Sequence, residues 1–141
     1  MDVAQRIGSA HKTPEHVLGL LRQYETDPRP KVYITVAGRS NALSGFTDGA
    51  VSAPVIACPP SSETFGGADI FSSLRMPSGI APALVLEPGN AALLAAKMLA
   101  LVDPAVRLSV LEHQRKQAEK IQADDQELPG RSGDHTLPVP L

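Results

Sequence analysis

The stretch KVYITVAGRS, residues 31–40, decides the fold of this chain, because it is a β-branched run that stops abruptly at a glycine and polar residues. Val, Ile, Tyr and Thr favour the pleated, buried environment of a parallel strand. Gly38 and the polar residues after it favour a loop. We therefore predict a buried strand over residues 31–37 that opens into a loop at its carboxyl end.

Working outward, similar short apolar runs recur on both sides of this stretch. PVIAC at residues 54–58 is closed by two prolines, and residues 81–86 form another run that ends at Glu87-Pro88-Gly89. Residues 3–7 alternate apolar and polar side chains before Gly8, which is typical of a strand that meets a loop. The sequence thus predicts four strands.

Helical signals lie between these runs. Thr13 followed by Pro14 predicts an N-cap and a first helical residue, and Asp27-Pro28 ends that helix. Further helical segments are predicted over residues 40–52, over residues 68–74 and from an N-cap at Asn90 to Leu101. Strands that alternate with helices indicate an α/β fold of right-handed βαβ units on a parallel sheet.

The C-terminal part differs in character. Residues 104–127 predict an amphipathic helix that packs on its own domain or on a neighbouring subunit, and residues 128–141, rich in Pro and Gly, are expected to be disordered. The α/β domain is accordingly assigned to residues 1–103.

Composition narrows the function. The chain has 141 residues, a net charge of −2 and no apolar run long enough for a membrane span, so neither nucleic acid nor a membrane is an expected partner. A small polar metabolite is a more suitable partner.

The single cysteine, Cys58, and the lack of an apolar leader fit a cytoplasmic protein. Aromatic residues make up only 4%, so the core must use small side chains, and oligomerisation is an expected source of further burial.

Two loops carry the side chains that could bind a ligand or take part in catalysis. GSAHKTP, residues 8–14, offers a hydroxyl, an imidazole and an ammonium group, and AGRSN, residues 37–41, offers a guanidinium, a hydroxyl and an amide. Ligands of parallel α/β sheets bind at the carboxyl ends of the strands, where both loops are expected. Together they could hold a phosphate and a heterocycle. Alone, His11 could be structural, Lys12 a solvated charge and Ser9 a turn cap. No metal-ligand spacing and no Gly-rich nucleotide motif is present, so no metal site is expected.

Four ordered motifs resemble the aminoimidazole ribonucleotide (AIR) carboxylase family. They are RIGSAHKTPE at residues 6–15, VAGRSNALSG at 36–45, PVIACPP at 54–60 and SSLRMPSGIAPALVL at 72–86. The SAHKTP and AGRSN forms are similar to the class II branch, which uses CO2, rather than to the class I mutases. The resemblance implies a flavodoxin-like, three-layer αβα sandwich that assembles as an octamer with active sites near subunit junctions.

The resemblance also implies a reaction and a site. Carbon 4 of AIR attacks CO2 without a cofactor, giving carboxyaminoimidazole ribonucleotide, and His11 matches the family's acid/base histidine. A neutral imidazole can accept the proton that the tetrahedral carbon must lose. Lys12 and Ser9 would hold the phosphate or the new carboxylate, Ser40 and Gly38 the CO2, while Arg39 and Asn41 would orient the carboxylate or shape the loop. The full set of substrate-binding positions is Ser9, Ala10, Lys12, Ala37, Gly38, Arg39, Ser40, Asn41, Met76, Pro77 and Ser78, the last three contributed by a neighbouring subunit.

The family pattern normally opens with a strand, a Gly-Ser-x-Ser-Asp loop and a helix, and none of these precedes Val3. The resemblance therefore implies a domain that is incomplete at its N-terminus, with a bare strand edge and without the usual phosphate and ribose cradle. Three explanations stay open: a reading frame that starts too late, a unit supplied by another chain, or a truncated paralogue that serves as a ribonucleotide-binding or structural module.

Overall fold

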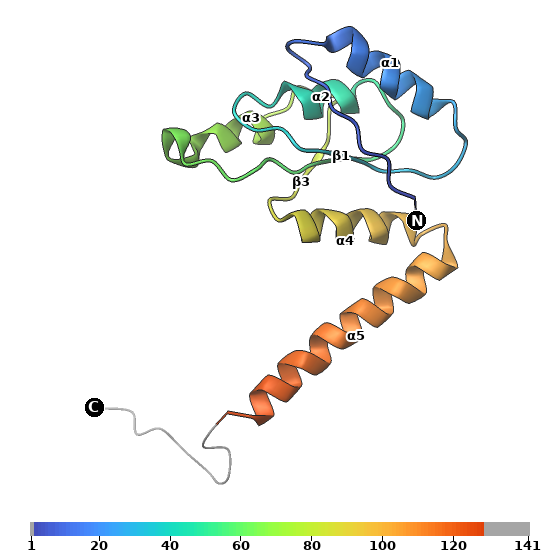
Figure 1. Ribbon diagram of the computed structural model, residues 1–141, viewed down its shortest axis with the longest axis vertical. Helices are drawn as coiled ribbons and strands as arrows, with labels where there is room; N and C mark the ends of the chain where they lie inside the picture. Colours follow the sequence, from blue (N-terminus) through green and yellow to red (C-terminus); the bar gives the residue numbers. More distant parts are fainter. Residues whose placement is uncertain (1, 129–141) are drawn as a thin grey trace.

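The computed structural model describes residues 2–128 and has an α/β fold with one small parallel sheet (Figure 1). Its strands are β1 (Tyr33–Thr35), β2 (Val55–Ala57) and β3 (Ala83–Leu84), in the order β1-β2-β3. The register pairs Ile34 with Ile56 and Ala57 with Leu84. Three of the four predicted strands are therefore confirmed, each shorter than the apolar run that predicted it.

The strand predicted for residues 3–7 is wrong. This segment is exposed, with Val3 at 83% and Ile7 at 93% exposure, and belongs to no strand. A strand needs a neighbour that supplies its ladder hydrogen bonds. β1 is an edge strand that pairs only with β2, so residues 3–7 have no strand of the described chain beside them.

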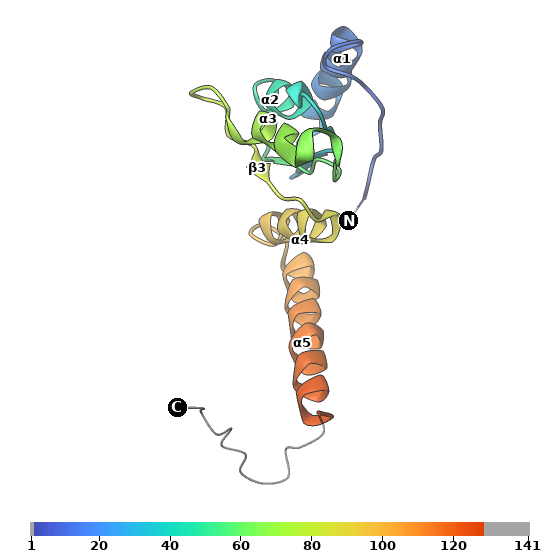
Figure 2. The same cartoon turned by 90° about the vertical axis from the view of Figure 1, so that its left-hand side faces the viewer.

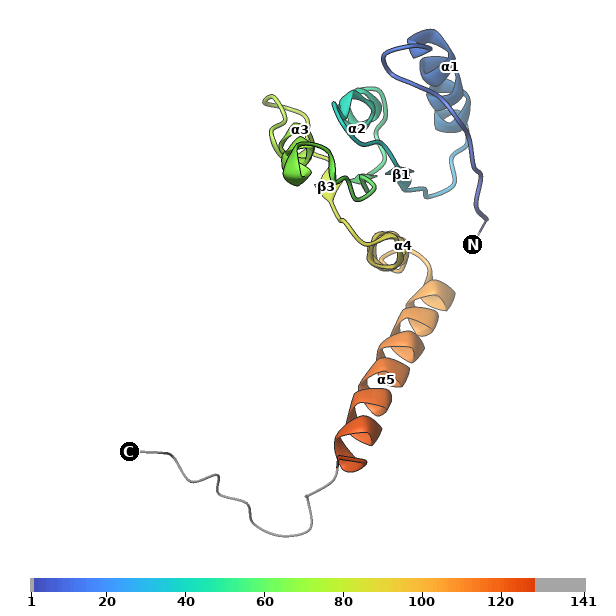
Figure 3. The ribbon, with the colours of Figure 1, turned by 60° about the vertical axis from the view of Figure 1, so that its left-hand side comes forward.

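Helices cover both faces of the sheet, which gives the predicted three layers. α1 (Pro14–Glu25), α2 (Ala42–Asp48) and α3 (Phe71–Leu74), the last preceded by the 3-10 segment η1 (Thr64–Ile70), lie on one side, and α4 (Pro88–Leu99) lies on the other (Figure 3). α4 starts at Pro88, and its N-cap position is Glu87, whose side chain makes no capping hydrogen bond, so the predicted N-cap at Asn90 is wrong. Proline at the first helical position has a preset φ angle and no N–H to satisfy, which explains the earlier start.

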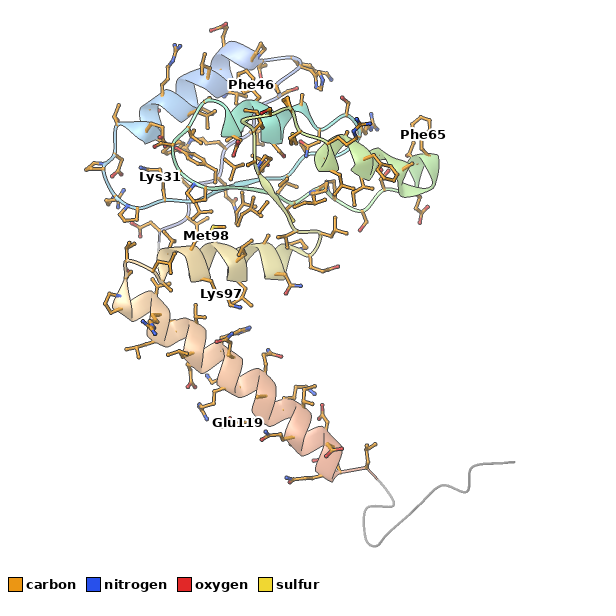
Figure 4. The ribbon with its side chains drawn as sticks, turned by 180° about the vertical axis from the view of Figure 1, so that it is seen from behind. Lys31, Phe46, Phe65, Lys97, Met98 and Glu119 are labelled. Carbon is orange, nitrogen blue, oxygen red and sulfur yellow. The ribbon has the colours of Figure 1, made fainter. Side chains whose placement is uncertain are left out.

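The core lies between the sheet and α4 and is built from small side chains. Ile56, Cys58 and Ala91 are its buried centre. Met98 points from α4 toward the sheet, whereas Lys97 on the same helix points away from it (Figure 4). Partly buried side chains packed against this centre are Val32, Val85, Leu94, Ala95 and Met98. The prediction of a core without large aromatic residues is confirmed here.

α5 (Pro104–Gln126) extends away from the three layers (Figure 2). Asp103 caps it, because its Oδ1 accepts hydrogen bonds from the N–H groups of Ala105 (2.9 Å) and Val106 (3.2 Å). Only Val106 and Val110 are buried, so the expected amphipathic character is confined to the first two turns. Exposed apolar side chains farther along α5 are Leu108, Leu111 and Ile121. The predicted disorder of residues 128–141 falls almost wholly outside the described residues.

No helix within residues 2–128 combines the length and the apolar character that crossing a bilayer requires.

Candidate active site

The first loop, residues 8–13, is a turn locked by Ser9 and Thr13. The Ser9 N–H donates to Thr13 Oγ1 (2.9 Å), and the Thr13 N–H donates to the Ser9 carbonyl (2.8 Å). Ser9 Oγ accepts a hydrogen bond from the Lys12 N–H at 3.2 Å, so its hydroxyl does cap the turn. Thr13 is the N-cap of α1 as predicted, but its side chain bonds back to Ser9 rather than to the helix. His11 and Lys12 are exposed, while Ser9 and Ala10 are half-buried.

The second loop, residues 37–41, is held in an unusual backbone conformation. Arg39 has φ of 59°, in the left-handed region that side-chain-bearing residues seldom adopt. Its N–H donates to Asp69 Oδ2 at 3.1 Å, and Ser72 Oγ donates to its carbonyl at 2.7 Å. Arg39 and Ser40 are exposed, and Ala37 and Gly38 are half-buried.

Asn41 shapes the loop. Its side chain is 4% exposed, and its Oδ1 accepts from the Ser44 N–H (3.2 Å) and from Ser44 Oγ (3.0 Å), which caps α2. Its Nδ2 donates to Ser73 Oγ at 2.9 Å. Ser44 Oγ lies 2.7 Å from Thr35 Oγ1, so a buried hydroxyl and amide chain runs from α3 to β1. Of the two roles left open for Asn41, the contacts match the second.

A cleft of about 620 Å³ lies beside the second loop. It is lined by Arg39, Ser40, Thr64, Phe65, Ala68, Asp69 and Ser72. Phe65 is 83% exposed and stands at the start of three consecutive residues with positive φ. A smaller hollow of about 200 Å³ shares Asp69 with this cleft and is lined by Gly38, Pro59 and Pro60 among others.

The two loops lie on the same side of the molecule, at the N-terminal ends of α1 and α2 (Figure 1). Neither of the two clefts is lined by His11 or by any other residue of the first loop. Within one chain the structure thus brings Arg39 and Ser40 together in one cleft, with Gly38 in the adjoining hollow, and leaves His11 outside both.

The predicted third segment, Met76 to Ser78, also lies outside these clefts. Met76 is half-buried and packs over Gly45, where an added Cβ would lie 3.2 Å from its sulfur. Pro77 and Ser78 are exposed and precede Gly79, which has φ of 88°. Because Pro77 and Ser78 are exposed, another molecule, such as a second copy of the chain, can contact them.

Asp69 and Ser72 line the cleft but are absent from the predicted site. Both fall in a small, polar segment after Gly66-Gly67, which sequence alone interprets as an ordinary loop and helical turn. Their contacts with Arg39 span 30 and 33 residues, and no local pattern indicates such pairing.

Cys58 is buried and directly follows β2, and burial raises the pKa of its thiol. In residues 2–128 no group of three or more His, Cys, Asp or Glu side chains is arranged to hold a metal ion.

Comparison with known proteins identifies the family. The model of the AIR carboxylase family matches residues 1–120. The chain belongs to the AIR carboxylase family. The phosphoribosylaminoimidazole carboxylase of Treponema denticola is 61% identical over 128 residues, which cover 91% of this chain and 80% of that protein. That of Archaeoglobus fulgidus is 57% identical over 128 residues, covering 91% of this chain and 70% of that protein.

The fold agrees with this assignment. The crystal structure of Treponema denticola PurE superposes with a TM-score of 0.88 at 61% identity, covering 90% of this chain and 80% of that one. The flavodoxin-like α/β sandwich implied by the motifs is thereby confirmed, and so is the family that the motifs indicated.

Proposed function

We propose that this protein carboxylates AIR with CO2, reversibly, in de novo purine biosynthesis. The observation that carries the proposal is the 61% identity to a phosphoribosylaminoimidazole carboxylase over 91% of the chain. It is supported by the family model, which spans both chemistry-bearing loops within residues 1–120. The class II, CO2-using branch is proposed from the SAHKTP and AGRSN forms of these loops.

In the proposed reaction, carbon 4 of the imidazole ring forms the new bond to CO2, whose carbon becomes a carboxylate. The same ring carbon then loses its proton to His11, which restores the aromatic ring. An exposed imidazole at the turn before α1 is sterically free to reach such a ligand. Lys12 supplies positive charge for the phosphate or carboxylate, and Ser40, which lines the large cleft, supplies a hydroxyl group for holding CO2.

A second copy of the chain would complete the site. His11 and the large cleft of one chain are separate, and Pro77 and Ser78 are exposed, so we propose that neighbouring copies bring these parts together. Exposed apolar side chains support burial in an assembly, which we propose to be an octamer. They are Val36, Phe65, Phe71, Leu74 and Leu86. We place the reaction in the cytoplasm, where the single free thiol of Cys58 stays reduced.

The test is incorporation of labelled CO2 into AIR by the purified full chain. We expect turnover by the wild type and a loss of about 10²- to 10⁴-fold in His11→Asn, the contribution typical of a general base. His16→Asn is the matched control, because His16 is an exposed histidine on α1 that has no proposed role. Absence of turnover by the wild type would refute the proposal. Turnover of the N-carboxylated substrate, but not of AIR with CO2, would replace the CO2 assignment with the mutase reaction.

A further inference from the structure

The backbone at Arg39 needs support from outside its own loop. A φ of 59° is unfavourable for a residue with a side chain, and such conformations persist only where the surroundings fix them. Arg39 is exposed, so packing of its side chain in a core does not supply that support.

Support comes from the segment that forms the opposite wall of the cleft. The Arg39 N–H donates to Asp69 Oδ2 at 3.1 Å. Ser72 Oγ accepts from the Asn41 N–H at 3.0 Å and donates to the Arg39 carbonyl at 2.7 Å or to the Asp69 carbonyl at 2.8 Å. Two side chains thus hold the backbone N–H groups on both sides of Ser40, and the Ser72 hydroxyl also holds the Arg39 carbonyl when its hydrogen points there.

Both supporting residues also line the large cleft, together with Arg39 and Ser40. The Asp69 carboxylate carries the same sign of charge as the phosphate and the carboxylate of the proposed ligands, so direct binding of either by Asp69 is unfavourable. Its Oδ2 is already engaged by a backbone N–H. These facts favour an indirect role over ligand contact.

We infer that Asp69 and Ser72 are positioning residues, which hold the loop from Arg39 to Asn41 so that Arg39 and Ser40 line the cleft in a fixed arrangement. The inference rests on the proposed function for the identity of the substrate, but the held loop itself does not depend on it. Loss of either bond frees the Arg39 backbone to leave the left-handed region, which displaces Ser40.

Amide hydrogen exchange tests the loop without reference to activity. In Asp69→Ala we expect the Arg39 amide to exchange about three- to tenfold faster, the factor that one net hydrogen bond represents. Asp69→Asn retains an acceptor oxygen and should keep the slow exchange. In Ser72→Ala the Asn41 amide should exchange faster by the same factor. Unchanged exchange in both alanine variants would overturn the inference.

Kinetics test the positioning role. At a temperature well below unfolding, we expect kcat/KM for AIR to fall about three- to tenfold in Asp69→Ala and Ser72→Ala, and to recover in Asp69→Asn. Asp103→Ala and Ser109→Ala are matched controls, since Asp103 caps α5 and Ser109 bonds within it. Both should leave kcat/KM unchanged, although Asp103→Ala removes the cap of α5 and should lower the stability of the protein.

The outcomes separate the two proposals. Faster exchange with unchanged kcat/KM in an active enzyme would show a purely structural clamp and overturn the positioning role. An inactive wild type with the expected exchange pattern would refute the proposed function and leave the held loop confirmed.

Discussion

Removing the Ser44 hydroxyl should destabilise the fold by about 2 kcal/mol. Ser44 is fully buried, and its Oγ lies 2.7 Å from Thr35 Oγ1 and 3.0 Å from Asn41 Oδ1. In Ser44→Ala, Asn41 Oδ1 keeps the bond from the Ser44 N–H, but Thr35 Oγ1 keeps only a 3.4 Å contact with the Ile56 carbonyl. A buried hydroxyl left short of a partner costs about 1–3 kcal/mol. With an m-value of about 2 kcal/mol/M, the urea midpoint should fall by about 1 M.

A double-mutant cycle sharpens this prediction. Thr35→Val should also destabilise, but Ser44→Ala/Thr35→Val removes both hydroxyls, so it should cost at least about 1 kcal/mol less than the sum of the single changes. The assay is urea unfolding followed by circular dichroism. Ser109→Ala, an exposed position on α5, is the control and should stay within about 0.5 kcal/mol of the wild type. Additive single changes, or a Ser44→Ala protein as stable as the wild type, would refute the reasoning.

Three further predictions concern the pH dependence of stability, the reactivity of the Cys58 thiol and the packing of Ile56 in the core. The Ser52 N–H and hydroxyl donate to Glu25 and hold the pKa of this carboxyl below its ordinary value of 4.5, so its contribution to stability is present above that pH and is lost as the pH falls through the lowered pKa. Glu25→Gln should therefore flatten the pH dependence of the unfolding free energy below pH 4.5, measured by urea titration at several pH values. Cys58, buried with a raised pKa, should react with a thiol reagent much more slowly in the native protein than in denaturant, and equal rates would contradict its placement. Ile56→Ala should cost about 2–5 kcal/mol in the same unfolding assay, because Ile56 has no exposed surface, and a change below 1 kcal/mol would argue against a core centred on it.

Local signals in the sequence predicted most of the elements. Short apolar runs located the three strands of the described residues, and Thr13-Pro14 located the start of α1, because a strand and a helix start are specified by neighbouring residues. Residues 3–7 were predicted as a strand from an alternation of apolar and polar side chains, yet they form no strand. A pattern of side chains predicts which face would be buried, but it cannot supply the partner strand whose backbone completes the ladder.

The site was predictable in part for the same reason. Both polar loops were recognised from their residue types, and Arg39 and Ser40 do line a cleft. Asp69 and Ser72 bond to backbone groups of Arg39, about thirty positions away in the sequence. Every residue has these backbone groups, so no pattern of residue types predicts the pairing. The choice for Asn41 between orienting the carboxylate and shaping the loop was left open, because the side-chain amide of Asn can bind a ligand or cap a helix.

The outline of the molecule has a consequence for its motion in solution. α5 is a helix of 23 residues, roughly 35 Å long at 1.5 Å per residue, joined to the three layers at one end. Its N–H vectors all lie nearly parallel to one axis, whereas those of the layers point in many directions. Rotational diffusion of a single chain is therefore anisotropic, and nitrogen-15 relaxation rates along α5 should form a group distinct from those of the rest.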